Sequence, residues 1–272
     1  MVVGIAGAPA QFEIGRVISR TFDVIGKNPV TFFGLSLLLS IPYLIFSFYG
    51  AIALYFGVGA QWLVTPGTQM QPGTVATAVA IGIVGFLVYF VFSNLLQAAI
   101  THGTIVSLNG DKASFGDCFA TGIKNALPLT AIALLGGVGI IFGCFLLLVP
   151  GIILMLAWSV ITPVRVSEQT GIIETLKRSA SLTSGYKGPI FGIFVIYGGL
   201  SWVLNLVIRP LAGVPLMSTG TVANAFLVLM LLTGLVRAVL GLIGAAGIAS
   251  IYYELRLVKE GVGPEQLAAV FS

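Results

Sequence analysis

The chain has 272 residues, of which 57% are apolar and 8% are charged, and its formal net charge is +4. Soluble domains carry roughly 25% charged residues, so this composition excludes a soluble globular protein. No formally charged residue occurs in residues 28–110, and a bilayer interior disfavours charge strongly. The small, dispersed positive charge also excludes nucleic acid as a partner. Most of the chain is therefore expected to lie among membrane lipids.

Apolar segments of ~20 residues are long enough to cross the hydrocarbon of a bilayer. In chain order, the first is expected at residues 32–56. A second follows at 75–108, after a Pro- and Gly-containing polar loop at 65–74. The last two are expected at 189–208 and 222–253, and both have the length of a membrane-spanning helix.

The middle segment, residues 128–164, is 37 residues long. It is too long for one comfortable crossing and slightly short for two crossings with a turn. Two crossings that turn near residues 143–151 would place the basic segments 111–124 and 165–187 on the same side of the membrane. We therefore predict two crossings and six membrane-spanning helices. A re-entrant pair that crosses only part of the bilayer is the alternative.

Positive charge is distributed very unevenly over the two sides that this topology defines. One side receives eleven Lys and Arg residues, the other receives only Arg209, and Arg237 lies inside the last segment. Under the positive-inside rule, this asymmetry places both termini in the cytoplasm and predicts a multi-pass protein of the bacterial inner membrane. The eleven are Arg16, Arg20, Lys27, Lys112, Lys124, Arg165, Lys177, Arg178, Lys187, Arg256 and Lys259.

Three cytoplasmic segments share one pattern: a large apolar residue, a Lys some five positions later, an Asn or Gly, and then a Pro that opens an apolar segment. A short amphipathic helix in the membrane interface, ended by Asn or Gly and followed by Pro in the first turn of the next helix, would explain it. The predicted fold is an all-α helical membrane bundle with six spans and three interfacial amphipathic helices. It forms one domain, residues 1–272, with repeat units at about 12–108, 112–164 and 170–253 and a tail at 254–272. The pattern is carried by Lys27 with Pro29, Lys124 with Pro128, and Lys187 with Pro189.

Arg237 is the main candidate for function because an ionisable residue within a span marks a functional site by default. No Asp or Glu occurs within the predicted spans to neutralise it. Asn94, Gln97 and Thr101 form a polar stripe on the second span, and they are its predicted partners. Arg237 would line a site for an anion or lipid phosphate. Alternatively, it would lock the bundle by hydrogen bonding to carbonyl groups, or face a water-filled cavity.

Other candidates have weaker support. The adjacent pair Lys177 and Arg178 could contact lipid headgroups, although Glu174 at helical spacing could pair with either residue. His102, the only histidine, is expected to be structural, because no acid or cysteine lies near it in sequence. The two cysteines form neither a disulfide framework nor a metal site. No cofactor, metal or catalytic residue is predicted.

The chain resembles bacterial six-span inner-membrane proteins, including YciC-like proteins and the membrane domain attached to some glycerophosphoryl diester phosphodiesterases. The resemblance implies a helical, polytopic domain. The soluble phosphodiesterase barrel is absent, so no catalytic activity or functional residue is implied. The resemblance is carried by residues 148–154 (Leu-Val-Pro-Gly-Ile-Ile-Leu), Trp158, Pro163, Val164, Glu168, residues 176–185, residues 252–256 (Tyr-Tyr-Glu-Leu-Arg) and residues 259–261 (Lys-Glu-Gly).

These observations favour a non-catalytic integral membrane protein that supports membrane or envelope organisation. The alternative is a transporter or flippase for a small anionic solute or lipid that uses Arg237. A third hypothesis, an interfacial lipid enzyme acting near His102, ranks last. Small-residue motifs, 139–143 and the series from Gly234 to Ala249, predict close helix packing within the chain or in a homodimer.

Overall fold

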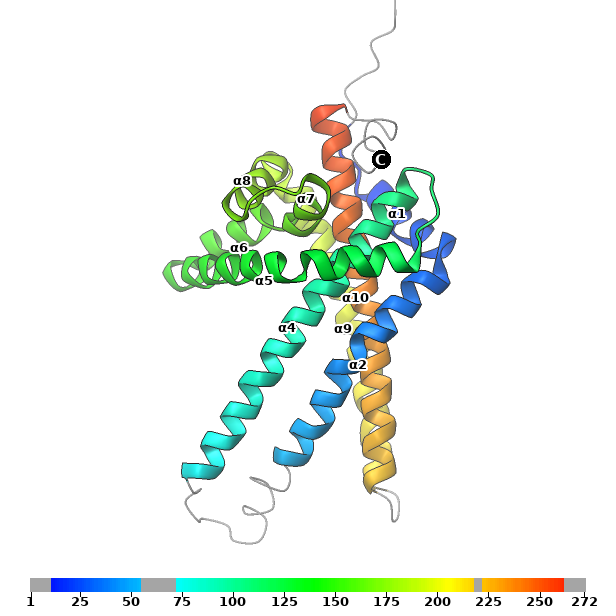
Figure 1. Ribbon diagram of the computed structural model, residues 1–272, viewed down its shortest axis with the longest axis vertical. Coiled ribbons are helices and arrows are strands. Elements are labelled where there is room, and N and C mark those ends of the chain that lie inside the picture. The colour runs from blue at the N-terminus through cyan, green and yellow to red at the C-terminus, as the bar shows by residue number, and fades with distance from the viewer. Residues whose placement is uncertain (1–10, 55–71, 218–221, 262–272) are drawn as a thin grey trace, which may run out of the picture.

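The computed structural model describes residues 11–54, 72–217 and 222–261. Most of the predicted polar loop at 65–74 and the tail beyond residue 261 lie outside these residues. All regular structure in the described residues is helical (Figure 1). The helices are α1 (Ile14–Lys27), α2 (Pro29–Leu54), α4 (Pro72–Leu108), α5 (Phe115–Leu146), α6 (Leu148–Ala157), α7 (Ile161–Glu168), α8 (Ile172–Thr183), α9 (Lys187–Met217) and α10 (Val222–Glu260).

Six helical segments are long and apolar enough to cross a membrane. They agree with the predicted spans, including a turn within 143–151, where Leu147 separates α5 from α6. This confirms the all-helical class and a multi-pass membrane protein. The six segments are Pro29–Phe46, Val75–Leu108, Phe115–Leu146, Leu148–Glu168, Lys187–Val207 and Leu231–Glu260.

The long helices are arranged in two directions (Figure 1). Helices α2, α4, α9 and α10 run away from one end of the molecule, and we call the parts that extend beyond α5 the shafts. Helix α5 lies across them, with α6 folded back along it. Helices α1, α7, α8 and the last turns of α10 lie on the other side of α5, and we call this part the charged end.

Helix α1 is amphipathic, as predicted. Its buried residues are Val17, Thr21, Val24 and Ile25, which recur at the spacing of one helix face. The helix ends at Asn28, whose N–H donates to the Val24 carbonyl, and Pro29 then opens α2. Burial of this apolar face against α10 and α4 holds α1 to the molecule, because a 14-residue helix is marginal in isolation.

In two of the three predicted units a separate short helix precedes the long apolar helix, although in the third Lys187 and Gly188 lie in α9 and do not end α8 as predicted. The repeat itself stays a prediction. α1 precedes α2 across Asn28, and α8 precedes α9 across Gly185, whose φ of +86° is accessible to glycine without strain. In the second copy the expected interfacial helix is continuous with α5, and Pro128 lies inside it. The prediction of a break there is wrong. The reason is that Asn125 does not end the helix, since its buried side chain donates to the Thr121 carbonyl one turn earlier.

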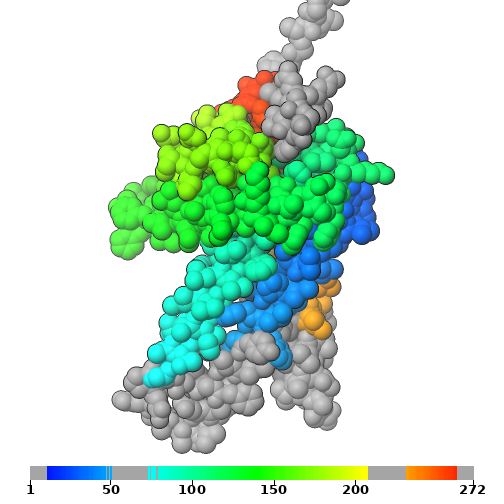
Figure 2. Space-filling model, in the orientation of Figure 1, coloured from blue at the N-terminus to red at the C-terminus, as the bar shows by residue number. Residues whose placement is uncertain are grey.

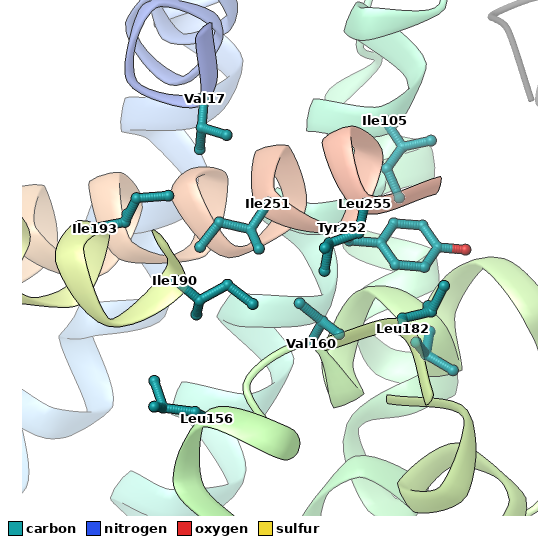
Figure 3. Close-up of a cluster of buried hydrophobic side chains, with 11 residues drawn as sticks. Val17, Ile105, Leu156, Val160, Leu182, Ile190, Ile193, Ile251, Tyr252 and Leu255 are labelled. Carbon is teal, nitrogen blue, oxygen red and sulfur yellow. The ribbon is translucent and has the colours of Figure 1, made fainter. Parts of the chain in front are cut away.

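A buried hydrophobic cluster joins the charged end to the top of the shafts (Figure 3). It combines side chains from helices that are distant in sequence, and Tyr252 is its largest member. The cluster therefore fixes α1, α8 and α9 around α10. Its labelled residues are Val17, Ile105, Leu156, Val160, Leu182, Ile190, Ile193, Ile251, Tyr252 and Leu255.

Small residues are used for packing within the chain. A side chain at Gly143 would meet the backbone of Gly151, so the glycines allow α5 and α6 to approach closely. Gly139 lies against the ring of Trp158. On α10, Gly241 packs on Leu96 of α4. These contacts confirm intrachain packing at these positions, while a homodimer stays a prediction.

Candidate functional site

Arg237 lines a pocket between three shafts. The pocket lies between α2, α4 and α10 and has a volume of about 260 Å³. This is close to the lower end of the size range of small-ligand sites, ~300 Å³. None of its lining residues is an Asp or Glu. The polar side chains that line it are Ser40, Tyr43, Tyr89, Ser93, Gln97 and Arg237.

The Arg237 side chain is exposed rather than buried against carbonyl groups. Its guanidinium carbon lies 4.9 Å from the centroid of the Tyr43 ring, a cation–π contact. Within the described residues, the guanidinium forms no ion pair or hydrogen bond, so its N–H donors remain available. The structure therefore shows an arginine that faces a pocket, and whether this pocket binds an anion or holds water stays a prediction.

The depth of the pocket follows from two contacts and one spacing along α10. Gly122 of α5 packs on Leu95 of α4, and the adjacent Leu96 packs on Gly241 of α10. Arg237 precedes Gly241 by one helical turn, about 6 Å along the axis. The pocket therefore lies on the shaft side of α5, directly beneath it. In Figure 1, α4 and α10 diverge below α5.

The predicted partners of Arg237 divide into two groups. Gln97 lines the same pocket, and its side-chain oxygen accepts a hydrogen bond from Thr162 at 2.8 Å. Asn94 is buried, donates to the Phe90 carbonyl of its own helix and is not among the lining residues. Thr101 is fully buried further along α4, and its hydroxyl has no hydrogen-bond partner among the described residues. The structure thus brings only Gln97 to Arg237.

Sequence reasoning missed the α2 side of the pocket. Tyr43 carries the guanidinium, and its ring also contacts the ring of Tyr89, with centroids 5.2 Å apart. A signal was present, because Ser36, Ser40 and Tyr43 recur on one face of α2. Ser36 lies on the same face and donates to the Ala238 carbonyl, directly beside Arg237.

The charged end has the opposite electrostatic character, because the arginines of α1 and Arg178 of α8 are paired with carboxylates. Glu254 of α10 is fully buried and accepts hydrogen bonds from two arginines of α1, from Arg16 at 2.7 Å and from Arg20. Arg20 also lies over the ring of Tyr253. These contacts join α1 to α10 at its most buried acidic residue.

A second ion-pair group joins α7, α8 and α10. The Arg178 Nε donates to the carboxylate of Glu168 at 2.8 Å, and its terminal nitrogen donates to Glu260. Burial alone would lower the pKa of Arg178, but these two hydrogen bonds outweigh it and raise the pKa above its ordinary value. Glu260 also accepts from Arg256 at 2.8 Å, and Tyr252 donates to Glu168 at 3.0 Å. Arg178 is therefore engaged in internal contacts.

The two predicted headgroup contacts therefore differ. Lys177 is exposed on α8, whereas Arg178 is bonded to two carboxylates. Glu174, the predicted alternative partner, instead accepts from the N–H of Gly171 and caps α8. Lys177 thus remains the candidate for contact with a lipid headgroup, and this stays a prediction.

The remaining candidates are His102 and the two cysteines. His102 is half-buried on α4. Cys118 is buried and Cys144 is exposed, and both are free thiols. In residues 11–54, 72–217 and 222–261, no group of three or more His, Cys, Asp or Glu side chains is placed to hold a metal ion.

The fold and pocket thus define a multi-pass membrane protein with a pocket between its helices that is lined by an arginine. Comparison with protein-family models, with curated proteins and with solved structures finds no match for this chain. The resemblance to six-span inner-membrane proteins therefore stays a prediction.

Proposed function

We propose that the protein is a non-catalytic integral membrane protein that binds the anionic group of a small solute or lipid at Arg237 and transports it, as a transporter or flippase does. The observation that carries the proposal is the Arg237 guanidinium, which faces an open pocket without a carboxylate. An uncompensated charge in an apolar span is costly, and an anionic ligand would offset that cost.

The chemistry of the pocket supports an oxyanion as ligand. A guanidinium binds phosphate or carboxylate through paired N–H donors. The Tyr43 ring holds it from one face, while hydroxyl groups of Ser40 and Ser93 and the amide of Gln97 add neutral donors. A small volume suits a headgroup or a free anion, and the acyl chains of a lipid would remain outside between the shafts.

Flux through reconstituted vesicles tests the proposal. Two probes are used: a fluorescent phosphatidylglycerol, scored by movement between leaflets, and inorganic phosphate, scored by efflux. We expect one probe to move with the wild-type protein and to move about tenfold more slowly or worse with R237A or R237Q, because a hydrogen bond to a charged group is lost. The matched control K124Q removes an exposed positive charge elsewhere and should retain flux.

The two possible negative results contradict different parts of the proposal, the role of Arg237 and transport itself. Flux that R237A and R237Q leave unchanged would contradict the Arg237 mechanism. No flux of either probe would contradict the transporter proposal.

A second candidate function is the organisation of the membrane or envelope. A separate observation favours it: the α5–α6 tip projects beyond the shafts and exposes apolar side chains (Figure 2). Such a surface can act on lipids without catalysis. Detection of a turnover reaction that a single side-chain substitution abolishes would contradict this proposal.

A further inference from the structure

The α5–α6 hairpin differs from the other apolar helices in direction. It lies across the shafts, and its tip extends past α4 (Figures 1 and 2). Although the segment Leu148–Glu168 has the length of a span, it is divided into α6 and α7 and does not run as one helix. α5 has 32 residues, about 48 Å, but α6 has 10 residues, about 15 Å, and ends at the turn from Trp158 to Val160. The hydrocarbon core is ~30 Å thick, so α6 reaches only half of it.

The hairpin lies between two layers of different polarity. Leu129 and Ile132 of α5 belong to one buried cluster that includes Ala98 of α4, at the top of the shafts. The same cluster includes Leu176 of α8 and Val166 of α7, which belong to the charged end. The hairpin therefore occupies the boundary between the apolar shafts and the ion-paired end.

The tip of the hairpin has the surface of a lipid-embedded segment. Residues 125–164 contain no charged residue. From Phe145 to Val149, five consecutive apolar side chains are 64–87% exposed. Two backbone hydrogen bonds bridge the turn, since the N–H of Leu147 donates to the Gly143 carbonyl and the N–H of Gly151 donates to the Leu147 carbonyl. Apolar exposure on this scale is favourable in hydrocarbon and costly in water.

We propose that the α5–α6 hairpin lies parallel to the membrane plane, embedded in the acyl chains of the single leaflet nearest the charged end. Its partner is the acyl-chain layer of that leaflet, which is continuous with the lipid-facing surface of α4. The hairpin enlarges one leaflet relative to the other, and this asymmetry favours curved membrane. The inference deepens the membrane-organising function and rests on it for this last consequence.

The closing experiment measures depth along α5. Single cysteines replace lipid-facing residues Leu127, Leu134, Val138 and Phe145 in a background with C118A and C144A. Each is labelled with a fluorophore in vesicles of phosphatidylethanolamine and phosphatidylglycerol, and quenched by lipids that carry a nitroxide at a shallow or a deep acyl position. Val79 and Leu87 of α4, exposed on a shaft, are the matched control.

The two arrangements predict different depth profiles. A spanning α5 would change depth by ~27 Å between positions 127 and 145. We expect instead a shallow and nearly constant depth at all four α5 positions, while the two α4 positions differ by up to ~12 Å. A steady progression of α5 through the bilayer midplane would overturn the inference.

A second measurement tests the membrane-organising function separately from the in-plane placement of the hairpin. Labelled protein is reconstituted into giant vesicles from which narrow tubules are drawn, and its density is compared between tubule and vesicle. Enrichment on the tubules supports both the in-plane placement of the hairpin and the membrane-organising function. Constant depth without enrichment contradicts the membrane-organising function and leaves the in-plane placement established.

Discussion

Arginine side chains have opposite environments at the charged end and in the Arg237 pocket. At the charged end, Arg16, Arg20 and Arg178 each donate to a carboxylate, and one of those carboxylates, Glu254, is fully buried. In the pocket, Arg237 has an aromatic ring and neutral polar side chains around it. Where the chain supplies the counter-charge, the arginine holds helices together. Where it does not, the charge remains available to a ligand.

The largest expected effect comes from the charged end. The double variant R16A/R20A leaves the buried Glu254 without a positive partner, so we expect a loss of about 3–5 kcal/mol in the free energy of unfolding. Denaturant titration in mixed micelles, followed by circular dichroism, measures it. The control E13Q alters an exposed carboxylate that also pairs with Arg16, and it should change stability by less than about 0.5 kcal/mol. Equal effects in the two variants would show that Glu254 is not a structural anchor.

The second ion-pair group is more exposed, so its contribution should be smaller. R178A removes hydrogen bonds to Glu168 and Glu260, and we expect it to lower the free energy of unfolding by about 1–2 kcal/mol. The adjacent exposed residue provides the control, since K177A should stay within about 0.5 kcal/mol of the wild type. If K177A were the more damaging of the two, the assignment of Arg178 to internal pairing would be wrong.

On the pocket side, Tyr43 should affect ligand affinity. The contact between a guanidinium and an aromatic ring contributes about 0.5–1 kcal/mol at an exposed site, so Y43L should weaken anion binding about two- to fivefold. Equilibrium binding of a short-chain phosphatidylglycerol to the purified protein measures the change. F86L replaces an exposed aromatic residue of α4 that is not among the pocket residues, and it should bind as the wild type does.

The smallest effect on stability is expected at Arg237 itself. R237Q breaks no ion pair, and it removes a charge from an apolar span, so the free energy of unfolding without ligand should change by less than about 0.5 kcal/mol or increase. The same denaturant titration measures it. A loss as large as that of R16A/R20A would show that Arg237 is a structural lock, and the contrast between the two regions would disappear.

The sequence predicted the helices well and their directions poorly. Length and hydropathy located the apolar helices and the turn beside Leu147, and helical spacing of apolar residues located the amphipathic helices α1 and α8. The same quantities do not report direction, so the crossing of α5 over the shafts was not evident. Pro128 was misread because a proline near a lysine resembles a helix start, although Asn125 bonds within the helix.

The candidate site was predicted only in part, because the sequence does not show which helices pack against one another. Helical spacing identified the stripe on α4, and the structure brings its member Gln97 to Arg237. Spacing within one helix does not show which other helix lies opposite, so Tyr43 of α2 was missed. The pairing of Glu254 with α1 was missed because those residues are more than 230 positions apart in sequence.

The most direct test of the central claim is the affinity of the ligand-free protein for an anionic headgroup. Short-chain phosphatidylglycerol is titrated into wild-type protein, R237Q and K124Q in the same detergent, with short-chain phosphatidylcholine as a neutral-headgroup control. If Arg237 binds the anionic headgroup, R237Q should bind phosphatidylglycerol at least about tenfold more weakly, the equivalent of ~1.4 kcal/mol. K124Q should bind as the wild type does. Equal affinity in wild type and R237Q would contradict this role of Arg237.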